Sequence, residues 1–318
     1  MYMYVHIRMY VVNYNLDNIF QSLARPLNLA SDRRSSRITG LISVLTCTTR
    51  EHVYISLKTP TVQIPFNPRI LTMDLPTTWK HFYDTYDHRA IEVFGGLGIQ
   101  LLFFWIPATL IVLTEHFFPA FSLSHKMQPG RNQPDQILVA ARTSMANQLL
   151  LLSVHAVIVY GLGVSLLPID PILPSLGRFA ADFAFGLIFR EILFYYVHRL
   201  FHHPKLYPWI HKKHHRFTVP IAYAATYCTF TEHVLANTIP VVLPHTLLNA
   251  HVVSRWAFVG YEIFQSVIDH SGFYFTIWPA GRAHDYHHEK FRVCYGTIGL
   301  LDWLHGTDEM PLKKRKEG

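Results

Sequence analysis

Long runs without a charged residue dominate the pattern of polar and apolar positions after residue 93. The first run covers 94–113, and the second covers 143–169, between Arg142 and Asp170. A helix needs about 20 consecutive apolar residues to cross the roughly 30 Å hydrocarbon core of a bilayer. Each of these two runs therefore predicts a membrane-spanning helix.

A third apolar run, 179–197, differs because it contains Asp182, Arg190 and Glu191. Charged side chains within a membrane are costly unless they face protein or water. If this run forms a spanning helix, its three charges should face the protein interior or lie at the membrane edge.

A fourth uncharged run covers 234–254 and continues through 256–268 with only Glu262 charged. Pro240 and Pro244 interrupt it, so the segment predicts a helical hairpin that either spans the membrane or re-enters it. The whole pattern predicts an all-α integral membrane protein with about four to five transmembrane or re-entrant helices.

The first 72 residues show no sustained apolar period and contain only three acidic residues. This composition slightly resembles a transit segment, although no clear apolar core or cleavage site is visible, and Met73 is an alternative start. We expect four regions along the chain: an N-terminal extension at 1–76, two spans within 77–178, a catalytic domain at 179–310 and a basic tail at 311–318.

The composition also favours a membrane protein. Half of the 318 residues are apolar and 15% are charged, whereas soluble domains carry about 25% charged residues. The formal net charge of +7 suits basic cytosolic loops beside a membrane, and we expect no nucleic-acid partner. The three cysteines form no CxxC pair, so neither a disulfide framework nor a thiolate zinc site is expected.

Histidine carries the candidate chemistry, since the chain has 21 and thirteen of them lie between residues 198 and 288. They are concentrated in three short boxes, HRLFHH, HKKHH and HDYHH, whose spacings place side chains on one face of a helix. Neutral imidazole binds iron, zinc, copper and nickel. The box histidines are His198 and His202, then His211, His214 and His215, and finally His284, His287 and His288.

Eight histidines exceed the four ligands of one tetrahedral zinc ion, so two adjacent metal ions are predicted. Helix-bundle di-iron proteins use Glu-x-x-His pairs, and this sequence has none. It also lacks HExxH, because Arg292 stands where the second histidine would be needed. We therefore predict a nearly all-histidine dinuclear site, to which His270 contributes, whereas His203 and His233 do not.

Carboxylates near the boxes are candidate partners of the ligands, because a metal-bound histidine commonly donates its other N–H to a carboxylate or carbonyl. Glu191 lies two helical turns before His198 on the same predicted face. Asp285 and Asp269 each adjoin a candidate ligand. The alternative role for both aspartates is solvation at the surface.

The number of spans predicts the side of the membrane on which the boxes lie. If the first three runs span and the fourth is a hairpin, the boxes, the 114–142 loop and the tail share one side. That side holds most of the Lys and Arg residues near the membrane, which indicates the cytosol. The predicted architecture thus has a cytosolic helical cap that holds the histidines. The last residues also fit a KxKxx retrieval pattern, with a solvated basic tail as the alternative.

The order HxxxH, HxxHH, HSG(F/Y), HDxHH resembles the fatty acid hydroxylase/sterol desaturase superfamily of membrane di-iron oxygenases. Within it, the segments EILFYYVHRLFHHPKLYPWIHKKHH and HDYHHEKFRVCYGTIGLLDWLHGTDE are most similar to C-4 methylsterol oxidases and fatty acid hydroxylase domain-containing proteins. The similarity covers roughly residues 77–310. It implies an endoplasmic reticulum enzyme with two iron ions that uses O2 and receives electrons from NAD(P)H through a reductase and a b-type cytochrome. The metal ligands that it implies are His198, His202, His211, His214, His215, His270, His284, His287 and His288.

One loop departs from the methylsterol oxidase pattern A-E-Y-x-H-P-x-E, because this chain has ATYCTFTE. Thr226 stands at the first glutamate, and Thr229 and Phe230 replace the His-Pro pair, while Tyr227 and Glu232 remain. None of the replaced groups is a box histidine, so we expect metal binding to survive. The departure puts sterol C-4 demethylation in question.

The function predicted from these patterns is hydroxylation or oxidation of an unactivated C–H bond in a hydrophobic lipid, such as a sterol or a related substrate of lipid biosynthesis. Residues 189–196 and 256–264 are expected walls of the substrate pocket, with core packing as the alternative. Fatty acyl chains, sphingoid bases and specialised metabolites are alternative substrates, and desaturation is an alternative outcome. A metal transporter, a bis-histidine haem cytochrome and a non-enzymatic membrane protein are rival classes. Transport sites usually lie near the membrane midplane, whereas these boxes lie at the ends of the predicted spans.

Overall fold

The computed structural model describes residues 74–128, 136–274 and 280–308, together with the backbone of three short strands before residue 65. The chain divides into two units, Met1–Thr78 and Trp79–Gly318. The predicted retrieval pattern and most of the predicted N-terminal extension and basic tail lie outside the described residues.

The first unit contains a small antiparallel sheet with the strand order β1-β2-β3. Val53 in the central strand pairs with Thr48 on one side and with Ile64 on the other. The fold is mostly helical, as predicted, and this sheet is an exception that the sequence pattern did not predict. Its strands are too short to produce a visible period of two. Their bounds are β1 (Thr48–Thr49), β2 (His52–Ile55) and β3 (Val62–Ile64).

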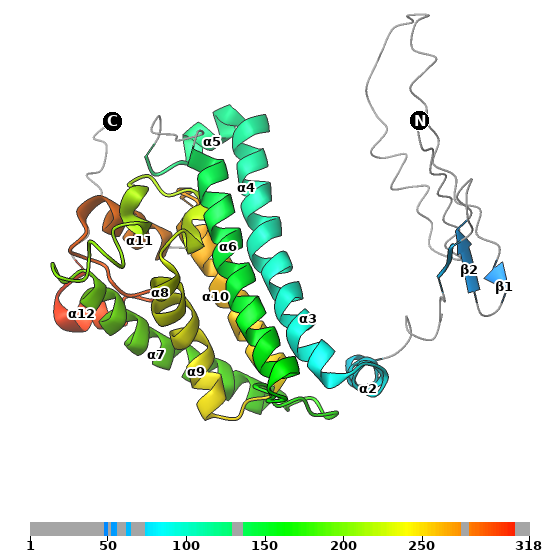
Figure 1. Ribbon diagram of the computed structural model, residues 1–318. Helices are drawn as coiled ribbons and strands as arrows, with labels where there is room; N and C mark the ends of the chain where they lie inside the picture. The colour runs from blue at the N-terminus through cyan, green and yellow to red at the C-terminus, as the bar shows by residue number, and fades with distance from the viewer. Residues whose placement is uncertain are drawn as a thin grey trace, which may run out of the picture. The chain divides into compact units, whose positions relative to one another are not determined.

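Two long antiparallel helical segments, α3 to α4 and α6 to η4, form one wall of the second unit (Figure 1). Among the described residues, His88–Phe117 and Ile137–Gly161 are the two helical stretches long and apolar enough to cross a membrane. Their outer faces carry exposed Leu102, Leu110 and Leu149, as expected for helices surrounded by lipid. The span count of four to five stays a prediction. The elements of this wall are α3 (His88–Gln100), the π-helix η2 (Leu101–Trp105), α4 (Ile106–Phe117), α6 (Ile137–Ala156) and the π-helix η4 (Val157–Gly161).

The third apolar run forms one continuous helix, α7 (Leu176–Phe201), which Ser175 caps at its N-terminus. Asp182, Arg190 and Glu191 are 1%, 7% and 0% exposed, which confirms the prediction that these charges face the interior. Arg190 pairs with Glu262 at 2.9 Å, so two of the buried charges in the predicted spans compensate each other.

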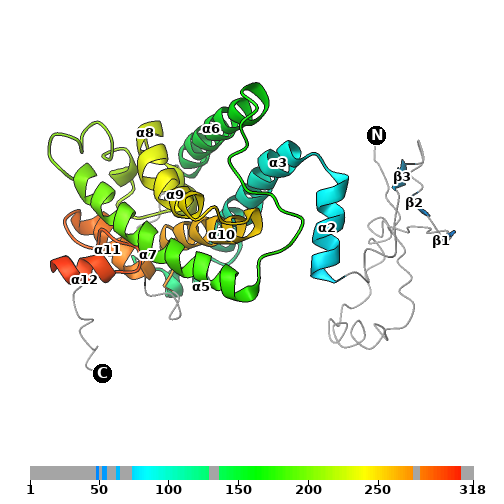
Figure 2. The same ribbon diagram turned by 90° about the horizontal axis from the view of Figure 1, so that it is seen from below.

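The fourth run forms a hairpin, as predicted. The π-helix η7 (His233–Thr238) leads into α9 (Ile239–Leu247), and α10 (Val252–Asp269) returns beside it. Asn249 turns the chain between the two helices with a left-handed φ of 47°. Figures 1 and 2 show α7, α9 and α10 packed together, with α11 (Ala280–Lys290) and α12 (Leu300–His305) beyond the C-terminal end of α7.

Buried polar contacts fasten the loop 217–229 to α6. Asn147 donates hydrogen bonds to the carbonyls of Thr226 and Cys228, both at 3.1 Å, and Gln148 donates to the hydroxyl of Thr226 at 3.2 Å. Because an unpaired buried polar group is costly, these bonds fix the loop relative to the wall. The loop carries η6 (Ala222–Thr226) and ends at α8 (Phe230–Glu232). The remaining helices are α2 (Leu75–Thr85), α5 (Pro119–His125) and η5 (His214–Arg216).

Candidate metal centre

The histidines of the first box lie at the C-terminal end of α7. His198 is in the last turn of the helix and His202 is its C-cap, so their spacing of four residues places both side chains on one face. Pro204 follows and prevents the helix from continuing. The box thus points away from the apolar body of α7 toward the segment 203–216.

The second box does not form the regular helical turn that its spacing predicted. Residues 203–213 form a series of turns and 214–216 a 3₁₀-helix, in which the amide of His214 donates to the carbonyl of His211 at 3.0 Å. This tighter winding rotates neighbouring side chains apart. As a result, His211 and His215 enter one cluster of histidines, and His214 enters another.

The third box, on α11, divides in the same way. His284 and His288 lie one helical turn apart and belong to the cluster of His214, whereas His287 faces the other cluster. The prediction that each HxxHH box serves a single point is therefore wrong, because adjacent residues of a helix face in different directions. His270, the C-cap of α10, completes the second cluster.

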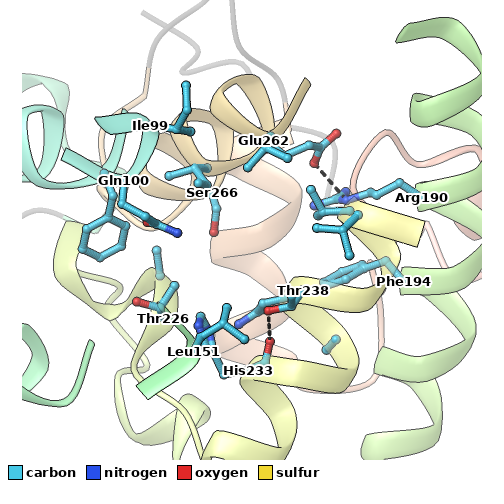
Figure 3. Close-up of a pocket in the computed structure, with 18 of the residues that line it drawn as sticks. Ile99, Gln100, Leu151, Arg190, Phe194, Thr226, His233, Thr238, Glu262 and Ser266 are labelled. Atoms are coloured by element: carbon cyan, nitrogen blue, oxygen red, sulfur yellow. Dashed lines mark hydrogen bonds and ion pairs between the residues drawn. The ribbon is translucent and has the colours of Figure 1, made fainter. Parts of the chain in front are cut away.

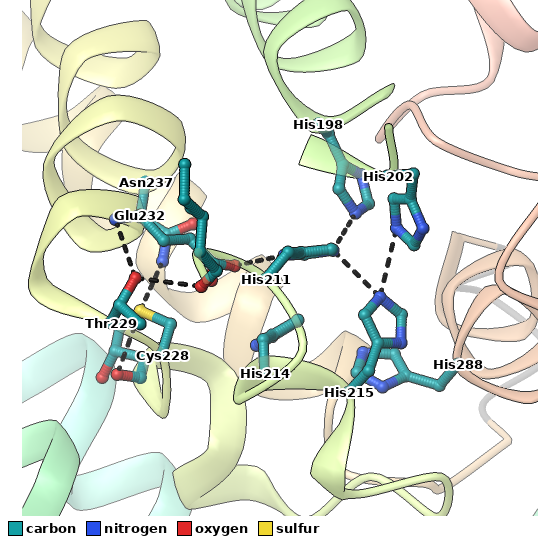
Figure 4. A network of polar contacts seen from close by, with 12 residues as sticks. His198, His202, His211, His214, His215, Cys228, Thr229, Glu232, Asn237 and His288 are labelled. Atoms are coloured by element: carbon teal, nitrogen blue, oxygen red, sulfur yellow. Dashed lines mark hydrogen bonds and ion pairs between the residues drawn. The ribbon is translucent and has the colours of Figure 1, made fainter. Parts of the chain in front are cut away.

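The two clusters contain all nine histidines predicted as ligands, and within each cluster the candidate ligand atoms lie within 4.8 Å of one another. Figure 4 shows six of these histidines, among them His198, His202 and His215. Neighbouring Nε2 atoms are 2.9–3.3 Å apart, for example 3.0 Å between His198 and His211 and 3.3 Å between His214 and His270. Metal–nitrogen bonds of about 2.0–2.1 Å place adjacent ligand atoms at about this separation. Cluster one consists of His198, His202, His211, His215 and His287, and cluster two of His214, His270, His284 and His288.

The outward nitrogens of four of these rings are held by backbone carbonyls, through hydrogen bonds that orient the inward nitrogens. The Nδ1 atoms of His198, His270 and His287 each lie 2.7 Å from a backbone carbonyl, and that of His288 lies 3.0 Å from the carbonyl of Phe217. A carbonyl only accepts, so each Nδ1 carries the proton and donates it. The lone pair of Nε2 is then free on the inner side, which is the arrangement typical of metal-bound histidine.

Burial keeps the cluster histidines neutral. It lowers the pKa of His198 and of His270 to about 4, and burial together with neighbouring imidazoles lowers the pKa of His202 to about 2. The same two causes lower the pKa of the other six. Neutral rings are the form that binds a metal ion, so the donor set fits two metal ions without a protonation cost at neutral pH.

Glu232 is the carboxylate that holds a cluster histidine, and the sequence analysis did not assign it this role. Its Oε1 accepts from Nδ1 of His211 at 2.6 Å, and its side chain is almost completely buried (Figure 4). Thr229 caps the short helix α8 by accepting from the amide of Glu232 at 3.3 Å. Glu232 matches the final glutamate of the methylsterol oxidase pattern although much of the ATYCTFTE segment differs, and this match could have identified it.

Glu191 has a different role from the one predicted. Instead of contacting His198, its carboxylate accepts from the amides of Thr297, Ile298 and Leu301 at 2.8–3.3 Å. His198 donates to the carbonyl of Tyr295. Glu191 and His198 lie on one face of α7, as predicted, but the loop that contains Tyr295 and Thr297 lies between their side chains.

Asp302 anchors the same loop, and this residue was also missed. Its carboxylate accepts from the amides of Tyr295 and Gly296 at 2.8 and 2.7 Å. Asp285 accepts from the side-chain amide of Gln128 at 3.1 Å, which differs from the predicted contact with a ligand. Burial raises the pKa of Asp285 to about 6.

A cavity of about 420 Å³ begins at the histidine clusters and extends between the helices (Figure 3). Arg190 and Phe194 of α7 line it, as do Trp256 and Ile263 of α10, which confirms the predicted walls. Along α10 the lining runs from Arg255 to His270, about 22 Å at 1.5 Å per residue. Its volume is in the range typical of small-molecule sites, about 300–1,000 Å³, and its length suits an elongated apolar molecule.

These features define the class of the protein: a mostly helical protein with two helices long and apolar enough to cross a membrane, in which two histidine clusters that could hold metal ions lie at one end of a long, mostly apolar cavity. The fatty acid hydroxylase family model matches residues 183–307, which include every cluster histidine. The chain belongs to the fatty acid hydroxylase family, and is therefore a lipid-modifying oxygenase in the broad sense of that family.

Three relatives illustrate the membership. Fatty acid hydroxylase domain-containing protein 2 from Homo sapiens is 34% identical over 246 residues, which cover 73% of this chain and 72% of that protein. A putative methylsterol monooxygenase from Dictyostelium discoideum is 27% identical over 245 residues, 73% of this chain and 88% of that protein. Methylsterol monooxygenase 1 from Rattus norvegicus is 33% identical over 123 residues, 36% of this chain and 42% of that protein. No solved structure matches the chain.

Proposed function

We propose that this protein is a di-iron membrane oxygenase that hydroxylates or oxidises an unactivated C–H bond of a hydrophobic lipid, a sterol or a related substrate of lipid biosynthesis. The observation that carries the proposal is the convergence of nine neutral histidines into two clusters at one end of a mostly apolar cavity. An unactivated C–H bond offers neither an acidic proton nor a leaving group, so side chains alone have no means to break it.

The two clusters would each hold one iron ion. Five histidines in cluster one exceed the tetrahedral set of structural zinc, and imidazole is a good ligand for iron. When bound, the two ions supply the activation of O2 that oxidation of such a bond requires. The protein contributes the fixed tautomers of the ligands, through the carbonyl partners of His198 and His287 and through the carboxylate of Glu232.

The cavity would orient the lipid and exclude water from the reacting carbon. Phe104, Phe194 and Ile263 provide apolar contact near the histidine end, where His198, His214 and His270 also form part of the lining. A lipid that fills the cavity therefore brings one of its carbons beside the clusters. Val154 lines the cavity from α6 while 45% of its surface is exposed, so this wall is a candidate entrance from the bilayer.

The cellular setting belongs to the same proposal. We place the protein in the endoplasmic reticulum as a multi-pass protein, with the histidine cap in the cytosol and residues 179–310 as the catalytic domain. The electron donor would be a b-type cytochrome with its NAD(P)H reductase. The basic residues predicted on the cap side support this orientation.

A straight-chain lipid is the second candidate substrate. Thr226, which replaces a glutamate of the methylsterol oxidase pattern, lines the cavity and accepts a hydrogen bond from Gln148. A very-long-chain aldehyde decarbonylase from Oryza sativa is 33% identical over 149 residues, 43% of this chain and 49% of that protein. The changed loop is thus the feature that favours a fatty acyl, sphingoid or specialised substrate, and desaturation is the corresponding alternative reaction.

Metal analysis and lipid analysis test the proposal together. Full-length protein purified from cells supplied with iron should contain close to two metal ions per chain, and deletion of the gene should cause one lipid class to accumulate. Re-expression should remove that lipid only in the presence of O2. One metal ion or fewer per chain, or an unchanged lipid profile, would contradict the proposal.

A further inference from the structure

His233 lines the cavity without belonging to either metal cluster. Its side chain is 3% exposed, and neither ring nitrogen has a hydrogen-bond partner among the described residues. Leaving two buried nitrogens without partners costs free energy, because each has lost its hydrogen bonds to water. A ligand in the cavity would provide the missing partners.

Both backbone groups of His233 have hydrogen-bond partners, so only the nitrogens of its ring are unpaired. The amide of His233 donates to the carbonyl of Thr229 at 2.9 Å, and its own carbonyl accepts from the hydroxyl of Thr238 at 2.8 Å (Figure 3). His233 also begins the π-helix η7. A π-helix inside an α-helix is rare and frequently occurs at functional sites.

A second unpaired polar atom lies in the same lining. Gln100 lines the opposite wall of the cavity (Figure 3). Its side-chain oxygen is buried and has no hydrogen-bond partner among the described residues. The cavity thus presents a neutral imidazole, which can donate and accept, and an amide oxygen, which only accepts. Burial lowers the pKa of His233 to about 4, so the ring is uncharged at neutral pH.

We infer that His233 binds a hydroxyl group of the lipid substrate, and that Gln100 on the facing wall provides a second polar contact within the same cavity. A hydroxyl both donates and accepts, so it can pair with a ring nitrogen of His233 or with the oxygen of Gln100, whichever it meets in the cavity. Glu232, the residue before His233, contacts His211, which places this hydroxyl site close to cluster one.

A carboxylate fits this site poorly. It only accepts, and would leave the oxygen of Gln100 unpaired. The lining that the structure describes also contains four carboxylates, Glu92, Glu232, Glu262 and Asp269, against two arginines, Arg190 and Arg255. The substrate class is therefore a lipid alcohol, with its oxygen near the clusters and its apolar remainder along α10.

This inference deepens the proposed function, and its test uses binding alone, so that it does not depend on turnover or on bound iron. The detergent-solubilised full-length protein is titrated with cholesterol and cholesteryl methyl ether, with 1-octadecanol and its methyl ether, and with stearate. We expect at least one of the two alcohols to bind about tenfold more tightly than its methyl ether, the equivalent of one hydrogen bond, and more tightly than stearate. A preference for cholesterol over its ether would indicate a sterol substrate, and a preference for 1-octadecanol over its ether would indicate a straight-chain alcohol.

Three variants assign the preference to His233. His233→Phe should abolish the preference for the alcohol, while His233→Gln, which retains a donor and an acceptor, should keep part of it. His245→Phe is the matched control, because His245 is also buried with two unpaired ring nitrogens among the described residues but packs on Phe258 outside the cavity lining. It should leave the preference unchanged.

The inference is wrong if the wild-type protein prefers neither alcohol over its methyl ether, if stearate binds as tightly as both alcohols, or if His233→Phe retains the preference. Two metal ions per chain together with any of these results would leave the proposed oxygenase intact and remove only the hydroxyl site. If the protein binds no metal but retains the preference for the alcohol, the hydroxyl site stands and the proposed oxygenase is contradicted.

Discussion

Neighbouring histidines of the first box have opposite surroundings, which provides a direct test of the candidate centre at the scale of single residues. His202 lies in cluster one, with its Nε2 atom 3.1 Å from that of His287, whereas His203 is exposed and belongs to neither cluster. His202→Ala should remove one inner ligand, lower the metal content below two per chain and reduce oxidation of the lipid to background. His203→Ala should change neither quantity. Equal effects of the two substitutions, measured by elemental analysis and product formation, would show that the clusters are not the active centre.

Glu232 supports a ligand without reaching the cluster itself. Glu232→Gln retains the shape of the side chain but replaces the charged acceptor for His211 Nδ1–H with a neutral amide. Loss of such a supporting group typically costs about 10–100-fold in metal affinity or activity. We expect that reduction in iron affinity, measured by competition with a chelator, with normal insertion into the membrane. An unchanged affinity would mean that the carboxylate does not orient His211.

The sequence analysis found residues whose positions follow from the spacing within one helix, and it missed residues whose contacts join distant parts of the chain. The eight box histidines could be selected from the sequence because spacings of three and four residues follow directly from helix geometry, whereas His270 was a ligand that the resemblance implied. The contact of Glu232 with His211 joins residues 21 positions apart through a turn segment, and no spacing rule predicts it. Glu191 was assigned to His198 because both lie on one face of α7, but the carbonyl of Tyr295 accepts the hydrogen bond of His198 instead, and Glu191 accepts from the amide of Thr297.

At the scale of elements, the loop that joins α11 to α12 is held from two sides by buried carboxylates. Glu191 and Asp302 both bind its amides, and a Cβ added at Gly296 would lie 2.6 Å from Oε1 of Glu191 and 2.8 Å from Oδ2 of Asp302. Gly296→Ala should therefore push the loop outward and displace the carbonyl of Tyr295 that orients His198. Overpacking of this kind costs about 1–3 kcal/mol.

The measurement for Gly296→Ala is the midpoint of thermal unfolding together with metal content. We expect a decrease of a few degrees and weaker retention of iron in cluster one. Gly98→Ala is the control, because a Cβ there meets no described atom within 4 Å, and alanine is the better helix former. If both variants unfold at the wild-type temperature, the close approach of the loop to Glu191 is not structurally important.

The elements themselves were predicted with uneven success, and the reason is physical. Long apolar runs gave α7, the long helices of the wall and the hairpin of α9 and α10, because membrane-length helices produce an extended signal. The turns at 203–216 and the π-helix η7 gave no such signal, and η7 packs against α7 and α9, contacts between distant segments that a local pattern does not predict. The division of each HxxHH box between two clusters was also missed, because adjacent residues of a helix face in different directions.

At the scale of the whole molecule, the clusters join segments that are distant in the sequence. Cluster one links α7, the 203–216 turns and α11, and cluster two links these turns to α10 and α11. Because a metal ion binds only the folded arrangement, it should stabilise the cap by mass action. Removal of metal with a chelator should lower the unfolding temperature of the wild-type protein but not of a variant with both His202 and His214 replaced by alanine. An equal decrease in both proteins would show that the chelator acts elsewhere.

The orientation of the molecule in the membrane determines which compartment supplies its electrons. The loop 162–175 joins the end of η4 to the start of α7, and the 203–213 turns lie beyond the opposite end of α7. If α7 crosses the membrane with the histidine cap in the cytosol, the two segments lie in different compartments. An N-glycosylation acceptor inserted near Gly163 should then be modified in the endoplasmic reticulum, while one inserted near Lys212 should remain unmodified. Modification of the second acceptor would place the clusters in the lumen, where a cytosolic cytochrome has no access to them.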